Sequence, residues 1–188
     1  MRYDTDKLNG GLIRLYEKSF DSIRHQPLSY LEIGIHKGGS LLWARDFFDH
    51  PETTIYGIDL KLPQLDDSDR IVMLAGDQKD RGGLEAVANR YGPFDIVIDD
   101  GSHRPMETKQ TFDVFWPHVR TGGWYIIEDW GVSFLTEPHL AHLKGTTEMV
   151  TQLVCSKPTL GYSDLRLLMG ENSGASAWFR KGCDTISL

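Results

Sequence analysis

Two apolar segments of this chain end in adjacent acidic residues. The segment Phe94–Asp100 is mostly apolar up to its two final aspartates, and Trp124–Asp129 is apolar up to its final glutamate and aspartate. Short apolar runs of this kind are typical of strands that are buried on both faces of a parallel sheet. Because ligands of open α/β sheets bind at the carboxyl ends of the strands, we expect these acidic side chains to converge on one cleft.

Strand-like and helical segments alternate along most of the chain, which predicts βαβ units with right-handed crossovers. The expected strands are Tyr30–Ile35, Thr54–Leu60, Ile71–Ala75, Phe94–Asp99 and Trp124–Glu128, and the expected helices are Leu41–Phe48, Gly83–Tyr91, Met106–Val119 and Pro138–Val154. Two late runs, Asp164–Met169 and Ser176–Lys181, are joined by a short glycine-rich loop. A loop of that length leaves no room for a crossover helix, so these two strands should pair antiparallel.

The composition bounds the size and the partners of the protein. With 188 residues and 40% hydrophobic content, the chain is expected to form a single domain over residues 1–188, in which residues 1–27 are an amphipathic helical cover. A formal charge of -7 argues against nucleic-acid and anionic-membrane partners. The N-terminus shows no signal segment and no apolar run is long enough to cross a bilayer, which predicts a cytoplasmic protein.

A glycine-containing loop follows the first expected strand. The segment Glu32–Ser40 holds Gly34 and Gly38, with a spacing that differs from the dinucleotide pattern G-x-G-x-x-G. That spacing disfavours an NAD-dependent oxidoreductase and favours a cofactor without a pyrophosphate. Asp59 ends the second expected strand, where a carboxylate commonly accepts both hydroxyls of a ribose. The alternative is an ordinary βα turn with an aspartate that faces solvent.

Two further polar groups follow strands near that loop. Asp77 and Gln78 follow the third expected strand and could hydrogen-bond an adenine ring, although a helix-capping role for Asp77 explains the pattern nearly as well. Asp99 is best explained as a structural or cofactor-facing carboxylate. The expected cofactor contacts are therefore Glu32, Gly34, Gly38, Ser40, Asp59, Asp77, Gln78 and Asp99.

The acidic cluster also predicts a cation and a base. Carboxylates that lie close together repel one another unless a cation lies between them, and oxygen ligands suit a hard divalent ion. His103 follows Asp100 by three residues on the same loop, and an unperturbed imidazole titrates near pH 6.5, which suits a general base at neutral pH. A histidine that only hydrogen-bonds the loop is the alternative. His139 and His142 are explained better by a solvated helix face than by metal binding.

These motifs resemble the class I S-adenosylmethionine-dependent methyltransferases. The resemblance rests on Leu31–Gly34, Ile58-Asp59, Gly76–Gln78, Ile98–His103 and Gly122–Asp129, and it extends from about Asp4 to Asp129. The pairing of Asp-Asp-Gly-Ser-His with Ile-Glu-Asp is similar to that of metal-dependent sugar O-methyltransferases, such as the macrocin and mycinamicin enzymes and a mycobacterial methyltransferase of methylmannose polysaccharides. An opening Thr5-Asp6-Lys7 is also often found in that group.

The resemblance implies a fold, a cofactor and a set of site residues. The implied fold is α/β and Rossmann-like, with a seven-stranded, mostly parallel sheet whose last strand is antiparallel. S-adenosylmethionine would be the methyl donor, Asp100, Glu128 and Asp129 would hold Mg²⁺, and His103 would be the catalytic base. The long N-terminal domain of the macrolide enzymes is not expected within these 188 residues.

The sequence thus predicts a Mg²⁺-dependent O-methyltransferase that acts on a hydroxyl of a saccharide or glycosylated natural product. The acceptor would be a small molecule or an oligosaccharide, and a homodimer could complete the acceptor cleft. Two alternatives remain open at this point. One is a catechol-type O-methyltransferase, which would methylate phenols; the other is a non-catalytic S-adenosylmethionine-binding partner subunit, which would show no metal dependence.

Overall fold

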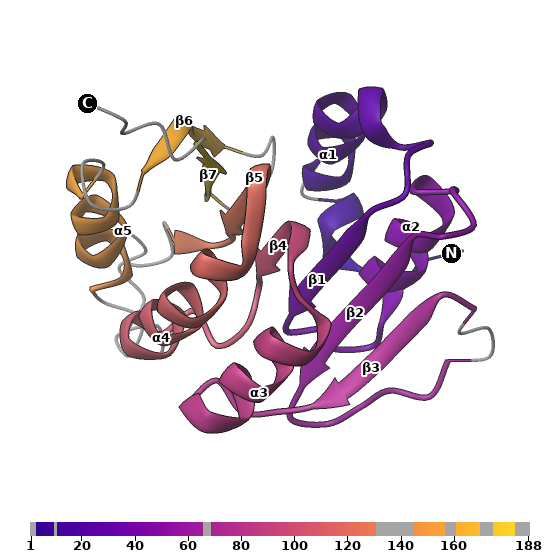
Figure 1. Cartoon of the computed structure of the whole chain (residues 1–188), viewed down its shortest axis with the longest axis horizontal. Coiled ribbons are helices and arrows are strands. Elements are labelled where there is room, and N and C mark those ends of the chain that lie inside the picture. Colours follow the sequence, from indigo (N-terminus) through magenta and orange to yellow (C-terminus); the bar gives the residue numbers. More distant parts are fainter. Residues whose placement is uncertain are drawn as a thin grey trace.

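In the computed structural model, seven strands form one mixed sheet in the order β3-β2-β1-β4-β5-β7-β6 (Figure 1). The structure describes residues 3–9, 11–65, 69–130, 145–156, 161–169 and 175–182. The strands are β1 (Ser29–Ile33), β2 (Thr54–Asp59), β3 (Ile71–Ala75), β4 (Phe94–Asp99), β5 (Val119–Ile127), β6 (Tyr162–Met169) and β7 (Ala175–Lys181).

The pairing of the strands confirms the predicted Rossmann-like α/β fold. Strands β1 to β5 pair parallel, whereas β7 runs antiparallel to both of its neighbours, β5 and β6. The predicted antiparallel pairing of the two late strands is therefore confirmed. Strand β5 begins at Val119, five residues before the predicted Trp124. The prediction missed this start because Gly122 and Gly123 lie inside the strand, although glycine disfavours strands.

Five α-helices and three short 3₁₀-helices are found in the described residues. They are η1 (Asp6–Leu8), α1 (Leu12–Phe20), η2 (Asp21–Ile23), α2 (Gly39–Phe47), α3 (Arg81–Tyr91), α4 (Pro105–Phe115), η3 (Trp116–His118) and α5 (Thr146–Cys155). Two apolar cores flank the sheet: α1 and α2 contribute to one of them, and α3, α4 and α5 to the other (Figure 1). No described helix is both long enough and apolar enough to cross a membrane.

The N-terminal cover is not one continuous helix. The predicted helical cover, residues 1–27, is divided into η1, α1 and η2, and Gly11 at the start of α1 has a left-handed backbone (φ 78°) that interrupts the helix. Helix α1 buries Tyr16 and Phe20, and both rings pack against Trp178 of β7. The cover is thus part of the core on that face of the sheet.

Several predicted features lie outside the described residues. The structure describes the predicted helix Pro138–Val154 only from Gly145 onward, so His139 and His142 are not covered. The loop between the last two strands, residues 170–174, is not covered either.

Candidate functional site

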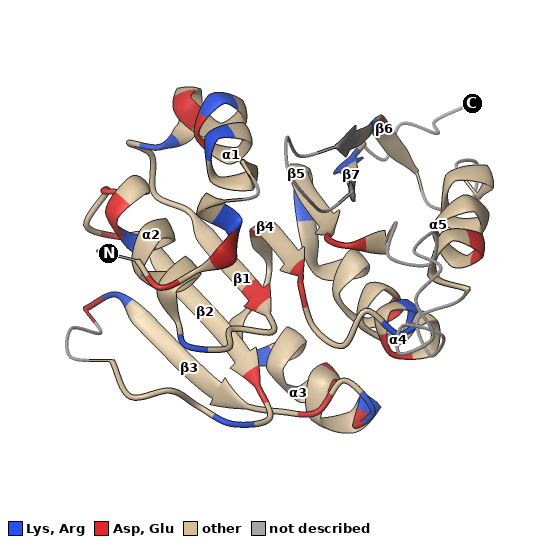
Figure 2. Ribbon diagram, turned by 180° about the vertical axis from the view of Figure 1, so that it is seen from behind, with Lys and Arg blue, Asp and Glu red and all other residues tan. Residues whose placement is uncertain are grey.

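A cavity of about 840 Å³ opens at the carboxyl ends of the parallel strands, where Figure 2 shows acidic residues at β2, β4 and β5. This volume falls within the roughly 300–1,000 Å³ of typical small-molecule sites. The lining residues come from the carboxyl ends of strands and the loops that follow them, from η1 and from α4. They are Asp6, Ile33, Gly34, His36, Ile58, Asp59, Leu60, Lys61, Gly76, Asp77, Gln78, Lys79, Asp100, Gly101, Ser102, His103, Arg104, Glu107 and Asp129.

The loop after β1 approaches the loop after β4 closely. Gly34 has φ 85°, and a Cβ atom there would lie 2.1 Å from the carbonyl oxygen of Asp100. Only glycine satisfies both constraints. The Oδ2 atom of Asp59 accepts hydrogen bonds from the backbone N–H groups of Ile35 (2.8 Å) and His36 (3.0 Å), which fixes the same loop from the side of β2.

Gln78 braces the loop that carries the histidine. Its Nε2 atom donates to Oδ1 of Asp99 (3.0 Å), and its Oε1 atom accepts from the backbone N–H of Ser102 (2.7 Å). A Cβ atom on Gly101 would lie 2.4 Å from Oε1 of Gln78, so the loop packs directly on this side chain. Asp77 lines the cavity and accepts from the N–H of Lys79 (2.9 Å), as a turn-forming aspartate does.

Asp99 and Asp100 point to opposite faces of the sheet, as the twofold alternation of a strand requires. Asp99 is 2% exposed and accepts hydrogen bonds from Thr111 of α4 and Tyr125 of β5. Burial raises the pKa of Asp99 to about 6, although these hydrogen bonds oppose the shift. Asp100 points instead toward the face that α1 and α2 cover, where it contacts Lys7.

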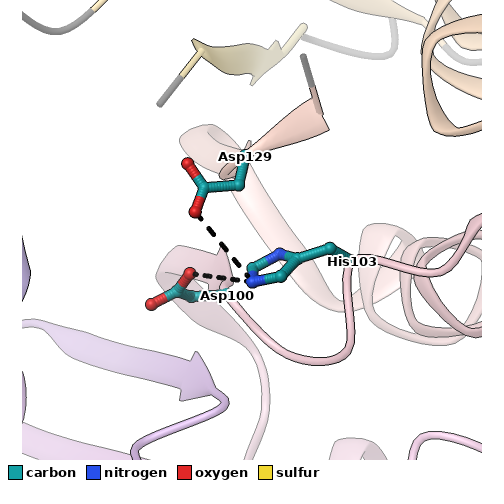
Figure 3. A group of neighbouring side chains, drawn as sticks. All are labelled: Asp100, His103 and Asp129. Atoms are coloured by element: carbon teal, nitrogen blue, oxygen red, sulfur yellow. Dashed lines mark ion pairs between the residues drawn. The ribbon is translucent and has the colours of Figure 1, made fainter. Parts of the chain in front are cut away.

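The His103 side chain lies between two carboxylates, near the carboxyl ends of β4 and β5. Its Nε2 atom is 3.9 Å from Oδ1 of Asp100 and 4.0 Å from Oδ2 of Asp129 (Figure 3). Ligand atoms of these three residues all lie within 4.8 Å of one another, and all three side chains are partly exposed. His103 (φ 56°), Asp129 (φ 54°) and the cavity-lining His36 (φ 46°) have left-handed backbones, and such outliers concentrate at functional sites.

A buried lysine contacts three carboxylates, one of which is Asp100 of this group. Lys7 is 5% exposed, and its Nζ atom lies 2.6 Å from Glu128, 2.9 Å from Asp100 and 3.0 Å from Glu32. Burial alone would lower the pKa of Lys7, but the three carboxylates raise it well above its usual value. Burial and mutual repulsion raise the pKa values of Asp100 and Glu128, and Lys7 opposes that shift. Tyr16 adds a 2.6 Å hydrogen bond to Glu128.

The structure brings seven of the predicted site residues to the cavity wall and leaves five away from it. Those on the wall are Gly34, Asp59, Asp77, Gln78, Asp100, His103 and Asp129; those away from it are Glu32, Gly38, Ser40, Asp99 and Glu128. Glu32 and Glu128 face Lys7, and Asp99 faces α4. Ser40 is buried in α2, and Gly38 precedes that helix with a left-handed φ of 79°. Among the described residues, the group that could hold a metal consists of Asp100, His103 and Asp129 and does not include the predicted Glu128.

Sequence reasoning missed Lys7 as a site residue, and it also missed Asp6 and Tyr16. A signal for Lys7 was available, because the buried Glu32 and Glu128 require a cation and the resemblance already included the opening Thr5-Asp6-Lys7. Lys7 is separated from Glu128 by 121 positions in the sequence, so the pattern alone did not pair the two residues.

Residues 31–130 match the family described as "Methyltransferase domain". Among curated proteins, the chain is 46% identical over 122 residues to the 8-demethyl-8-(2-methoxy-alpha-L-rhamnosyl)-tetracenomycin-C 3'-O-methyltransferase of Streptomyces olivaceus, a match that covers 61% of this chain and 31% of that protein. It is 45% identical over 121 residues to the mycinamicin VI 2''-O-methyltransferase of Micromonospora griseorubida, with 61% and 30% covered. The chain thus spans about a third of the length of these relatives.

Comparison with solved structures also finds methyltransferases. The MycE methyltransferase from the mycinamycin biosynthetic pathway, in complex with Mg, SAH and mycinamycin VI, is 32% identical with a TM-score of 0.76; the match covers 93% of this chain and 50% of that one. A putative caffeoyl-CoA O-methyltransferase from Staphylococcus aureus, 14% identical with a TM-score of 0.65 over 90% of this chain and 82% of that one, shares the fold. Because the family match extends over more than half of the 188 residues, this chain belongs to the methyltransferase-domain family.

Proposed function

We propose that this chain is a catalytic domain that transfers a methyl group from S-adenosylmethionine to a sugar hydroxyl of a glycosylated small molecule, with Mg²⁺ as a second cofactor. The observation that carries the proposal is the group of Asp100, His103 and Asp129 on the wall of a cavity of about 840 Å³. The names of the relatives, which include sugar-modifying O-methyltransferases of antibiotic pathways, support the choice of a sugar hydroxyl.

The loops on one side of the cavity fit a nucleoside cofactor. Gly34 has no side chain, so a ligand can approach its backbone closely. Asp59 lines the cavity, and within the described residues its Oδ1 atom accepts only a 3.3 Å hydrogen bond from the N–H of Lys61, so that oxygen can accept a ribose hydroxyl. Asp77 and Gln78 are proposed to border the base, while Glu32, Gly38, Ser40 and Asp99 would support the cofactor loops from behind the wall.

The group around His103 fits a hard divalent cation. Asp100 and Asp129 offer carboxylate oxygens within 4.8 Å of each other and of His103, and Mg²⁺ prefers oxygen ligands. Lys7 and Tyr16 both donate to Oε1 of Glu128, the third predicted ligand, so Oε2 is the oxygen with which it could join the ion. We propose Asp100 and Asp129 as ligands and keep Glu128 as a prediction.

The chemistry divides between the cofactors and the protein. When bound, S-adenosylmethionine supplies the methyl group, and Mg²⁺ supplies positive charge that orients and acidifies the acceptor hydroxyl. His103 accepts the proton of that hydroxyl at Nε2. Asp100 and Asp129 lie 3.9 and 4.0 Å from Nε2, where their negative charges stabilise the imidazolium that results.

A methyl-transfer assay with labelled S-adenosylmethionine tests the proposal. We expect glycosides to be methylated, EDTA to abolish turnover, and added Mg²⁺ to restore it. Full turnover after chelation would contradict the metal assignment. Methylation of catechols in place of glycosides would favour the catechol-type alternative, and cofactor binding without any turnover would favour a non-catalytic partner subunit.

The organisation of the protein is also part of the proposal. We propose that residues 1–188 form a single methyltransferase domain in which residues 1–27 cover one face of the sheet. The packing of α1 against Trp178 and the contribution of Asp6 to the cavity wall support it. A homodimer and a cytoplasmic location stay predictions from the sequence.

A further inference from the structure

We propose that Lys7 is a positioning residue that sets the direction of the Asp100 carboxylate at the cation site. The inference rests on the proposed function, because it concerns the same metal group. It assigns a role to a residue of the N-terminal cover, far in the sequence from the strand-end carboxylates that it contacts.

The ammonium group of Lys7 is paired with several carboxylates and donates a hydrogen bond to Oε1 of Glu128. Three carboxylates surround Nζ of Lys7, on Glu128 at 2.6 Å, Asp100 at 2.9 Å and Glu32 at 3.0 Å. Lys7, Glu32 and Glu128 are almost fully buried, so water does not compete for these contacts. The position of the ammonium is therefore set on three sides.

Asp100 divides its two oxygens between Lys7 and the cavity. Its Oδ2 atom contacts Nζ of Lys7 at 2.9 Å, and its Oδ1 atom lies 3.9 Å from Nε2 of His103. A carboxylate is planar, so an anchor on one oxygen also fixes the direction of the other. Lys7 thereby presents Oδ1 to the group formed with His103 and Asp129.

The charges of the cluster also fit a cation next to Lys7. When all three carboxylates are ionised, they and the one ammonium leave two unbalanced negative charges, which a divalent ion at Asp100 would balance. Lys7 alone therefore does not neutralise the cluster. Its removal would increase the repulsion among the carboxylates and release Asp100 from its anchor.

The anchor comes from a segment that also forms the cavity wall. Lys7 lies in η1, and the side chain of Thr5 accepts a hydrogen bond from its backbone N–H. Asp6, the preceding residue, lines the cavity. Lys37 ion-pairs with Asp4 of the same segment at 2.9 Å, but this pair is exposed. Lys37 thus offers a matched control.

The test compares Mg²⁺ affinities by calorimetry in the absence of acceptor. Lys7→Met keeps most of the side-chain length but removes the charge. We expect the dissociation constant for Mg²⁺ to rise by about 10- to 100-fold, the usual effect of losing a partner that orients a metal ligand. Binding of S-adenosylhomocysteine should change less than about threefold, because Gly34 and Asp59 do not touch Lys7. Lys37→Met should leave both affinities at their wild-type values.

A double variant separates orientation from charge and from folding. Lys7→Met combined with Glu32→Gln has the same formal charge in the cluster as the wild type, and Glu32 does not belong to the metal-ligand group. We expect this variant to melt near the wild-type temperature and still to bind Mg²⁺ weakly. Wild-type Mg²⁺ affinity in either variant would overturn the role of Lys7. Failure of the wild type to bind Mg²⁺ would instead overturn the metal part of the proposed function, and the inference with it.

Discussion

Asparagine at position 103 would remove the base while tolerating the local backbone. His103 has φ 56°, a left-handed conformation that asparagine adopts more readily than alanine. We expect His103→Asn to lower kcat by roughly 10²- to 10⁴-fold, the usual range for the loss of an acid–base group, and to leave cofactor affinity nearly unchanged. Steady-state kinetics and calorimetry measure both effects.

The control for that variant is His25→Asn, because His25 is exposed and pairs with Asp49 far from the cavity wall. If His103→Asn keeps a near-wild-type kcat, His103 has a structural role and a carboxylate is the better candidate for the base.

At the residue scale, the sequence predicted the convergence of Asp100, His103 and Asp129 correctly, because short apolar runs located the two strand ends. It did not predict the partner of Glu128. The direction of a side chain just beyond a strand follows from the strand's alternation, but the identity of the group it meets depends on tertiary packing. Lys7 reaches Glu128 from another element, across 121 positions.

At the scale of elements, the contact between the loops after β1 and β4 depends on Gly34. We expect Gly34→Ala to weaken both folding and cofactor binding, because the new Cβ would meet the carbonyl oxygen of Asp100 at 2.1 Å and φ is 85°. Gly122→Ala is the matched control: Gly122 has nearly the same φ, 83°, but no atom outside its immediate chain neighbours lies within 4 Å of the point that a new methyl group would occupy.

Gly122→Ala should therefore cost only the backbone strain, about 1–2 kcal/mol of unfolding free energy. Gly34→Ala should cost clearly more. Chemical denaturation measures both losses, and calorimetry with S-adenosylhomocysteine measures cofactor binding. Equal losses in the two variants, with cofactor binding intact, would show that the close approach of the two loops is unimportant.

The elements themselves were largely predictable, since β3 and β4 begin and end where the apolar runs do. The exceptions have local physical causes. Glycines concealed the start of β5, and the left-handed backbone at Gly11 divides the N-terminal cover. Strand and helix propensities alone do not locate these boundaries.

At the scale of the whole molecule, the buried acidic cluster should make stability depend on pH and on Mg²⁺. Burial raises the pKa of Asp100 to about 7 and that of Glu128 to about 8, whereas the same groups titrate near pH 4 in an unfolded chain. Between about pH 4 and 8 the folded state therefore binds more protons than the unfolded state. The contribution of these groups to the free energy of unfolding consequently falls as pH rises through that window.

We expect the melting temperature of the metal-free protein to fall between pH 6 and pH 8.5, with Mg²⁺ stabilising it most at the higher pH. The reason is that a cation can replace the protons that the carboxylates lose, and a ligand that binds only the folded state stabilises it. Glu128→Gln should flatten the dependence because it removes one titrating group. Asp49→Asn should not, because Asp49 is exposed at the surface. A melting temperature that rises with pH without metal, or a Mg²⁺ effect that is larger at pH 6 than at pH 8.5, would contradict the charge balance inferred for this cluster.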